Sequence, residues 1–552
     1  MKTPILGSSY VARSVNAADS RMVNLFPEIV PEGGKEPAFL NRAPGLRLLA
    51  NMGDGPIRGM WQFEGSAYVV SGNVLYKVDA LWRPTPIGTV SGSPGPVSMS
   101  DNGTQLFVAC NGPSYIYNRL TNQFKQIDDP DFPGAVTVGY LNGYFVFNEP
   151  NSQRLWITEL LDGTSIDPLD FASAEGSPDG LVSLLISHRE AWLFGTNSVE
   201  VWYDSGAADF PLTPVQGAFN EIGCIAAFSV AKLDNGIFWL GADARGRGIV
   251  YRASGYTAAR VSTHAVEWQI QQYGTLSDAI AYTYQQDGHA FYVLIFPSAN
   301  TTWVYDVATS AWHERAAFIN GSFTRHRSNC QMSFSNEIVV GDHEVGNLYA
   351  FDLDVFSDDG QPQKWLRSWR ALPAGTNDLK RTAHHSLQLD AETGAIEDSV
   401  TTPIVIVDVS SPDDELLTES GDVLAWEYSD PLLNDALVTE AGDRIVQENG
   451  GDILATIAPT ILGGALLIEI GQPTAIPIDP QVMLRWSDDG GHTWSNEHWR
   501  SMGKTGTYGT RVIWRRLGMT LKLRDRVYEV SGTDQTKIAI MGAELIMSPT
   551  NG

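Results

Sequence analysis

Between about residues 57 and 355, the sequence repeats one local pattern seven times. Each repeat has a short apolar run, a tight turn, a second run rich in aromatic residues, and a third run that often alternates aromatic and other residues. The first turns of the repeats fall at Glu64-Gly65, Asn102-Gly103, Asn142-Gly143, His188-Arg189, Asn235-Gly236, Asp287-Gly288 and Ser335-Asn336. Asn-Gly and Asp-Gly accept the positive φ angles of tight hairpin turns, so the pattern predicts consecutive β-hairpins.

The spacing of these repeats indicates how the strands are assembled. Units of roughly 36–53 residues fit the blades of a β-propeller, in which each blade is a small antiparallel meander. Helical periodicity is nearly absent from this part of the chain. We therefore predict an all-β protein with a six- or seven-bladed propeller, seven by our count. A stacked β-sandwich is the alternative.

Four segments follow from this pattern and from the distribution of charge. We predict an N-terminal arm over residues 1–50, the propeller over 51–370, and a C-terminal β domain built from 371–395 and 481–552. An acidic insertion at 396–480 interrupts that domain, with 17 acidic residues and one basic residue. Its net charge of −16 is more than half of the −27 of the whole chain of 552 residues.

The acidic insertion contains a short internal repeat. The sequence LLTESGDVL at 416–424 matches LVTEAGDRI at 437–445, and residues 449–454 partly repeat it. Each copy reads as strand, glycine-containing turn and strand, so we expect β-hairpins, although a solvated acidic loop is an alternative. The acidic residues of this segment include Glu419, Asp422, Glu440, Asp443 and Asp452. Carboxylate clusters also suit Ca²⁺, but the spacing lacks the usual calcium-binding loop.

The charge balance reverses after the insertion. Residues 481–526 hold nine basic and four acidic residues. Trp514 stands beside Arg515 and Arg516, with Arg511 shortly before, and aromatic residues with arginine are enriched at interface hot spots. We expect these four residues to form an interface. The alternative is a solvated basic strand.

One motif in this region has a recognisable local chemistry. Residues 487–494, SDDGGHTW, fit the Asp-box form S-x-D-x-G-x-T-W through Ser487, Asp489, Gly491, Thr493 and Trp494. In such a turn the carboxylate binds backbone groups and glycine takes a positive φ. The single copy predicts a structural turn and no catalytic function.

Several classes of function are disfavoured. No nucleophile elbow, HExxH, G-x-G-x-x-G in a βαβ unit or CxxC pair is present, so we expect no enzyme, no cofactor and no metal. Cys110, Cys224 and Cys330 are widely spaced and read as reduced thiols of the core. The apolar stretch from Ile453 is broken by Pro459 and glycines and is too short to span a membrane. A net charge of −27 argues against condensation on nucleic acid, because such binding depends on Lys and Arg.

Several segments resemble the packaged-DNA stabilisation proteins, also called tail hub or nozzle proteins, of short-tailed bacteriophages. They are DSRMVNLFPE at 19–28, APGL at 43–46, GSPDGL at 176–181, LFGTNSVEVW at 193–202, EIGCIA at 221–226 and RVIWRRLG at 511–518. The similarity runs in the same order over most of the chain. The acidic insertion at 396–480 has no counterpart in it.

This resemblance implies a structural protein of the virion tail that is made in the host cytoplasm. It implies a ring, usually of six copies, below the portal and the tail adaptor protein. The ring extends the DNA channel, retains the packaged genome, and holds tail fibres or spikes, or a needle-like plug. Double-stranded DNA would pass through without specific binding. In such a ring we expect the acidic hairpins of 396–480 to face the channel or form its distal tip, with Glu419, Asp422, Glu440, Asp443 and Asp452 in its wall. The alternative is a glycan-binding or glycan-degrading propeller, an adhesin or depolymerase.

Overall fold

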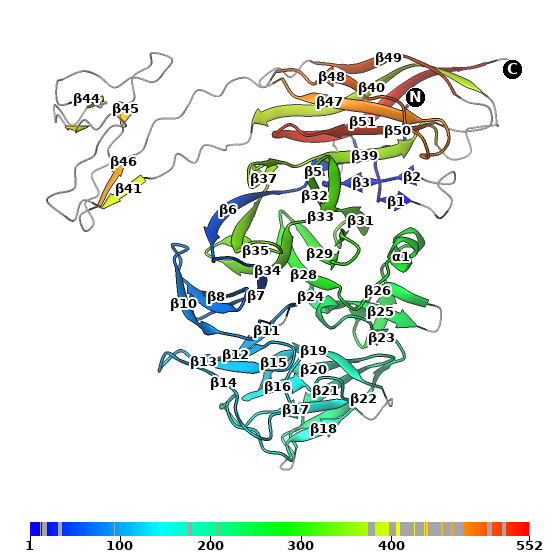
Figure 1. Ribbon diagram of the computed structural model, residues 1–552. Coiled ribbons are helices and arrows are strands. Elements are labelled where there is room, and N and C mark those ends of the chain that lie inside the picture. Colours follow the sequence, from blue (N-terminus) through cyan, green and yellow to red (C-terminus); the bar gives the residue numbers. More distant parts are fainter. Residues whose placement is uncertain are drawn as a thin grey trace. The chain divides into compact units, whose positions relative to one another are not determined.

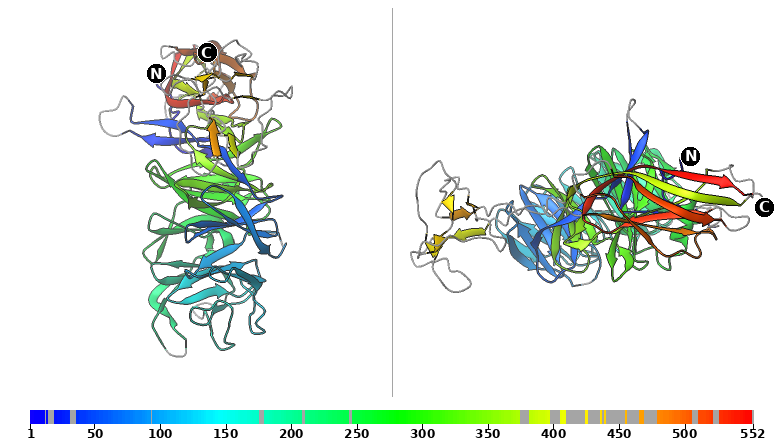
Figure 2. Two further views of the ribbon diagram at one scale, coloured as in Figure 1. Left: turned by 90° about the vertical axis from the view of Figure 1, so that its left-hand side faces the viewer. Right: turned by 90° about the horizontal axis from the view of Figure 1, so that it is seen from above.

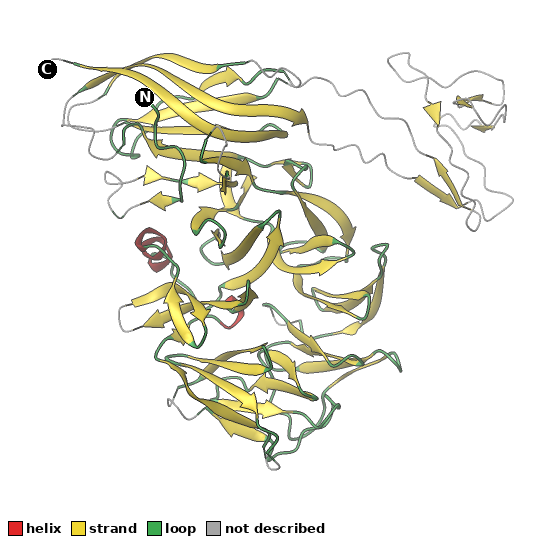
Figure 3. Cartoon of the chain, turned by 180° about the vertical axis from the view of Figure 1, so that it is seen from behind, coloured by secondary structure: helices red, strands yellow, loops and turns green. Residues whose placement is uncertain are grey.

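A computed structural model describes residues 1–396 and 479–550, apart from gaps at 12, 14–18, 31–35, 93, 175–178, 208–209, 244–245, 374–380, 505–509 and 521–525. Between 397 and 478 it describes only six short strands. The chain divides into two units, residues 1–394 with 479–552, and residues 395–478. The regular secondary structure of the described part is almost entirely strand (Figures 1 and 3).

Most of the first unit is a closed propeller whose seven blades follow one another along the chain. Blades 1 to 4 are regular four-stranded meanders: β7 (Ile57–Phe63), β8 (Ser66–Ser71), β9 (Val74–Val78) and β10 (Pro84–Thr89); β11 (Ser98–Asp101), β12 (Gln105–Ala109), β13 (Ser114–Asn118) and β14 (Gln123–Gln126); β15 (Val138–Leu141), β16 (Tyr144–Asn148), β17 (Arg154–Ile157) and β18 (Phe171–Ser173); β19 (Leu181–Ser187), β20 (Glu190–Gly195), β21 (Val199–Asp204) and β22 (Leu212–Asn220).

Blades 5 to 7 complete the ring. They contain β23 (Gly223–Cys224), β24 (Ala231–Leu233), β25 (Gly236–Asp243), β26 (Gly246–Ser254) and β27 (Thr257–Arg260); β28 (Ile280–Gln286), β29 (His289–Phe296), β30 (Thr301–Asp306) and β31 (Ala311–Glu314); β34 (Ser328–Phe334), β35 (Glu337–Asp342), β36 (Asn347–Asp352) and β6 (Gly45–Asn51). The η1 turn (Ala227–Ser229), helix α1 (His264–Gln271) and the hairpin β32 (Ala316–Ile319) and β33 (Ser322–Arg325) lie between blades. Strands β34 and β7 are in contact, which closes the ring.

The predicted turns join the first and second strands of the blades. Asn142 and Gly143 have φ angles of 48° and 104°, and Asp287 and Gly288 have 47° and 81°. Asparagine, aspartate and glycine tolerate this region better than other residues, which explains the local sequence choice. The all-β propeller class is therefore confirmed, and the blade number is seven in the described residues.

These first turns also touch the outer turns of the following blade. The Glu64 carboxylate lies 3.8 Å from the Arg119 guanidinium, and the Asn142 side-chain amide donates to the Asp204 carboxylate at 2.7 Å. The Asn102 side chain donates to the Leu161 carbonyl at 3.3 Å, and the Tyr256 hydroxyl donates to Glu190 at 2.5 Å. The same polar contact therefore recurs at four successive blade junctions, on one face of the propeller.

The first 50 residues supply strands to four different sheets. Strand β6, within the segment predicted as an arm, pairs antiparallel with β36 and is an outer strand of blade 7. Strands β4 (Leu25–Ile29) and β5 (Ala38–Arg42) form a hairpin, and β5 pairs with β51 (Thr536–Pro549) near the C-terminus. Figure 2 shows these N-terminal strands in blue beside the orange-to-red C-terminal strands. Short pairs also form between β1 (Tyr10–Val11) and β2 (Asp19–Ser20), and between β37 (Ser357–Asp358) and β38 (Gln361–Pro362).

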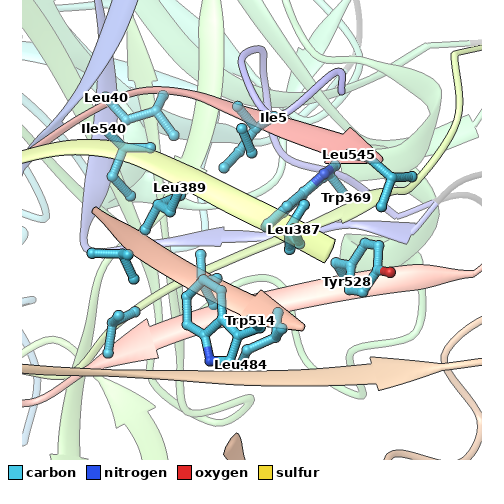
Figure 4. Close-up of a cluster of buried hydrophobic side chains, with 14 of the residues drawn as sticks. Ile5, Leu40, Trp369, Leu387, Leu389, Leu484, Trp514, Tyr528, Ile540 and Leu545 are labelled. Carbon is cyan, nitrogen blue, oxygen red and sulfur yellow. The ribbon is translucent and has the colours of Figure 1, made fainter. Parts of the chain in front are cut away.

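The C-terminal domain consists of two packed sheets. One sheet has the order β4, β5, β51, β40 (Thr382–Ile396) and β49 (Val512–Met519). The other contains β39 (Trp365–Arg370), β50 (Val527–Gly532), β47 (Gln481–Ser487) and β48 (His498–Ser501). Buried side chains from both sheets form one core, which Figure 4 shows around Leu387, Trp514 and Tyr528.

A two-residue strand joins the propeller to this sandwich. Strand β3 (Met22–Val23) pairs in parallel with β31 of blade 6 and antiparallel with β39, so blade 6 and the second sandwich sheet form one nine-stranded sheet. Asn24 follows with φ of 52° and is fully buried. Its side-chain amide donates to the carbonyls of Ala316 and Lys364 at 2.8 Å and accepts from the Ala316 N–H at 3.0 Å.

The second unit is described only through its strands. Three antiparallel pairs are present: β41 (Val405–Asp408) with β46 (Ala465–Ile468), β42 (Leu424–Ala425) with β44 (Val438–Thr439), and β43 (Asp435–Ala436) with β45 (Leu454–Ala455).

Asn24→Gly tests the junction without adding backbone strain, because glycine tolerates the positive φ. Three buried backbone groups would lose their partner, and each such loss costs about 1–3 kcal/mol. We expect the free energy of unfolding to fall by at least about 2 kcal/mol in urea denaturation. Asn51→Ala, which removes an exposed contact with Asn347, is the control and should change it by less than about 0.5 kcal/mol. Equal effects of the two substitutions would contradict the role of Asn24.

Candidate functional site

Three of the predicted interface residues lie on strand β49 and Arg511 directly precedes it, but the four do not share one environment. Arg511, Arg515 and Arg516 are exposed, whereas Trp514 is 1% exposed and its indole N–H donates to the His498 carbonyl at 2.8 Å. Successive strand residues point to opposite faces, which separates Trp514 from Arg515. The structure thus places Trp514 in the sandwich core (Figure 4), and the interface role of the three exposed arginines stays a prediction.

Both Arg515 and Arg516 reach solvent because the strand is irregular there. The pairing of β49 with β40 shifts between His384↔Gly518 and Ser386↔Arg515, and Arg516 has φ of 60°. A bulge places an extra residue on one strand and redirects its side chains. Two consecutive arginines therefore face solvent where a regular strand would present only one.

A groove of about 660 Å³ lies on the exposed side of these strands. Its lining residues include Arg515, Arg516, His385, Met519 and Ile546. Met519 and Ile546 are 55% and 62% exposed, so the groove combines cationic and apolar groups. His384 points the other way and contacts the buried hydroxyl of Tyr528 at 2.6 Å.

Other basic residues of this region are engaged within the domain. Arg526 is buried and donates to both carboxylate oxygens of Asp488, at 2.7 and 2.8 Å. Arg485 donates to Glu529 at 2.5 Å and lies over the Trp494 ring. The sequence alone did not separate these residues from the exposed arginines, because their partners come from other strands.

The Asp-box residues form a turn through side-chain contacts to the backbone. Asp489 accepts from the Ser487 hydroxyl and from the backbone and hydroxyl of Thr493, at 2.6–2.8 Å. The Gly491 N–H donates to the Ser487 hydroxyl at 2.7 Å, and Gly491 has φ of 99°. The hydroxyls of Ser487 and Thr493 hold the pKa of Asp489 well below its usual range. Trp494 is half-buried under Arg485.

The predicted channel residues Glu419, Asp422, Glu440, Asp443 and Asp452 lie outside the described residues. Among the residues that are described, no cluster of three or more His, Cys, Asp or Glu side chains is arranged to hold a metal ion. The helices of the described segments are too short or too polar to cross a bilayer.

The inner strands of the propeller surround an axial cavity of about 550 Å³. Arg58 lies in its wall and donates to the carbonyls of Gly95, Gly72 and Ser91 at 2.7–2.9 Å. Cys330 also lines the cavity, and burial raises the pKa of its thiol to about 12. Such a thiol stays protonated near neutral pH and is a poor nucleophile.

The other two thiols are also unsuited to catalysis. Burial raises the pKa of Cys110 and of Cys224 to about 11. All three cysteines are free.

Two protein-family models match the chain, one over the propeller and one over the sandwich. A family model described as "Bacteriophage P22 Gp10, beta-propeller" matches residues 1–356, and one described as "Bacteriophage P22 Gp10, beta-sandwich" matches residues 464–548. No curated protein sequence matches the chain.

Solved structures similar to the chain include three propeller-sized chains. The β-propeller domain of Cps50 (Swd1) from Myceliophteria thermophila has 8% identity and a TM-score of 0.37, covering 55% of this chain and 99% of that one. The computationally designed Ika8 protein has 11% identity, a TM-score of 0.35, and coverages of 55% and 99%. A chain of the mitotic checkpoint complex has 13% identity, a TM-score of 0.39, and coverages of 59% and 96%.

Substitutions on β49 distinguish core from surface. Trp514→Ala should lower the free energy of unfolding by about 3–5 kcal/mol, because it removes a large buried side chain. Arg515→Ala should change it by less than about 0.5 kcal/mol. Guanidinium denaturation of both variants measures the difference. A small effect of Trp514→Ala would mean that the indole is not buried in the core.

Asp489→Asn tests the Asp-box turn through pH. The lowered pKa in the folded state means that the carboxylate stabilises the fold above its unfolded pKa of about 3.9, and that this contribution is lost as pH falls below it. The melting temperature of Asp489→Asn should therefore be below wild type at pH 7, with a gap that narrows below about pH 4. Asp131→Asn, at an exposed position, is the control. A gap that is independent of pH would contradict this account.

Proposed function

Because the chain belongs to the bacteriophage P22 Gp10 family, whose members are structural proteins of the phage tail, we propose that it forms a ring in the tail below the portal and adaptor. In this position the ring extends the DNA channel and helps to retain the packaged genome. The proposed partners are further copies of the chain, six in all, the tail adaptor protein, and tail fibres, spikes or a needle-like plug. The protein would be made in the host cytoplasm.

The observation that carries this proposal is the nine-stranded sheet that runs through blade 6 and the sandwich. A ring that holds pressurised DNA has to transmit force between the parts of each subunit. Backbone hydrogen bonds across β31, β3 and β39 join the propeller and sandwich directly, without a flexible linker at this point. Such a subunit suits a mechanical role.

The side chains that bridge the two parts support the same role. Arg42 is buried and donates to the carbonyls of Phe356, Asp534 and Thr536 at 2.6–2.9 Å. Arg21 binds both carboxylate oxygens of Glu314 in blade 6, at 2.8 and 2.9 Å, while its backbone exchanges hydrogen bonds with Ser368 of β39. Paired charges and satisfied carbonyls favour one fixed arrangement of these elements.

The charge of the chain suits a conduit for DNA. The segment 396–480 carries −16, so six copies would carry about −96. Screening acts over roughly 8–10 Å in physiological salt and leaves strong repulsion at short range. A negative wall denies phosphates the Lys and Arg contacts on which non-specific binding depends. We propose that this segment lies at the channel or its distal mouth, where DNA slides without sticking.

A glycan-active propeller is less well supported. The Asp-box side chains bind one another and the local backbone, which accounts for their presence structurally. The described residues also give no assembled catalytic group at the axial cavity, where Arg58 binds backbone carbonyls.

Deletion of residues 400–475 from the phage tests the channel role. We expect the ring to assemble, with packaged DNA leaking or ejection slowing, measured by nuclease-accessible DNA and by ejection kinetics. A matched variant changes Glu419, Asp422, Glu440, Asp443 and Asp452 to their amides and keeps the chain length. It lowers the charge of six copies from about −96 to about −66, and should slow ejection more at low salt. Normal retention and ejection, with only adsorption to the host lost, would place the segment on the outer surface.

A further inference from the structure

Three leucines are exposed around one turn of the propeller. Leu120 lies in the outer turn of blade 2 and is 68% exposed, and Leu160 and Leu161, in the outer connection of blade 3, are 57% and 58% exposed. Both groups adjoin the first turn of blade 2, because Arg119 donates to the Gly103 carbonyl and Asn102 to the Leu161 carbonyl, each at 3.3 Å. We call these three residues the leucine tip. Clustered exposed apolar side chains mark interaction sites more often than isolated ones.

The backbone of the leucine tip is held in an unfavourable conformation. Leu161 has φ of 61°, a region in which a bulky side chain is a genuine outlier. Its N–H donates to the Gly143 carbonyl at 2.8 Å. The neighbouring Asp162 carboxylate accepts from Gln105 and from Thr164, at 2.8–3.2 Å. A strained residue fixed in this way, with its apolar side chain in solvent, points to a role outside the fold.

The surroundings of the leucine tip are acidic. Residues 98–173, which form blades 2 and 3, contain nine acidic and three basic residues, a net charge of −6. Glu159, directly before Leu160, is exposed. The tip therefore fits a surface that offers apolar groups together with positive charge.

The groove over β49 is such a surface. Its apolar members Met519 and Ile546 are exposed, and Arg515 and Arg516 stand beside them on the bulge. The groove is concave, whereas the tip lies on exposed turns. The same chain thus carries two surfaces with complementary charge and with apolar groups on both.

We propose that the leucine tip of one copy docks into the β49 groove of the next copy. The contact joins two different surfaces, so it is heterologous, and a heterologous contact closes into a ring when the rotation between copies allows. This inference rests on the proposed ring and names the surfaces that build it. Charge complementarity would favour this pairing over tip-to-tip contact between copies.

Cysteine pairs in assembled tails test the contact. We would place Leu160→Cys and Arg515→Cys in one chain, purify tails, and treat them with a short bismaleimide. The expected result is a ladder of linked copies up to the closed ring, while either single substitution gives none. In the assembled tails, before cross-linking, a monofunctional maleimide should label the cysteines at positions 160 and 515 less than the cysteine of a Leu81→Cys control. Leu81 lies in blade 1 and is 70% exposed.

A second pair of variants separates docking from folding. Leu160→Asn with Leu161→Gly removes the apolar tip and the unfavourable φ, so its melting temperature should equal or exceed that of wild type. Its incorporation into tails should fall at least tenfold, whereas Leu81→Asn should leave incorporation unchanged. The cysteine variant could enter tails, label freely at both positions and give no ladder. That result would overturn this contact but would leave the ring possible. Absence of wild-type chain from any ring would instead overturn the proposed function.

Discussion

The architecture depends on the insertion of strand β3 between the propeller and the sandwich. Val23 alone pairs with β31, and Met22 and Val23 pair with β39, yet they make blade 6 and the sandwich sheet one continuous hydrogen-bonded layer. Asn24 directly after β3 satisfies backbone groups from both sides of the junction, and its positive φ turns the chain into β4. Buried backbone groups have to be paired, so this small segment holds the propeller and the sandwich together. Because β6 is an outer strand of blade 7, the same N-terminal region also completes the propeller.

Negative and positive charge lie on different parts of the chain. The net negative charge is largest in segment 396–480 and is weaker in blades 2 and 3, while three exposed arginines, Arg511, Arg515 and Arg516, lie on or directly before β49. Within the sandwich, the buried Arg526 is paired with Asp488. Charges of opposite sign on separate surfaces instead suit association between copies and exclusion of nucleic acid from a channel.

Local turn chemistry explains how much of the fold is readable from the sequence. Asn142-Gly143 and Asp287-Gly288 predict their hairpins, because the tolerance of Asn, Asp and Gly for positive φ angles depends on the residue type alone. The pairing of β3 with β31 and β39 joins residues about 290 and 340 positions apart, and nothing in a two-residue strand specifies such partners. The stretch at 19–28 resembles a phage tail family, but its sequence does not reveal the structural role of Asn24.

The candidate interface shows the same limit. The basic run on β49 was visible, but Trp514 faces the core, because neighbouring strand residues alternate. The bulge that exposes both Arg515 and Arg516 depends on pairing with β40, which is distant in sequence. Leu160 and Leu161 carried no recognised motif, and only their exposure and the φ of Leu161 single them out.

The most direct test of the account is an electron-microscopy class average of the purified virion tail, with this chain identified by a bound antibody fragment. We predict a closed ring of copies around the DNA channel, with the propeller and sandwich of each copy in one fixed arrangement. Isolated copies at the periphery of the tail, away from the channel, would contradict it.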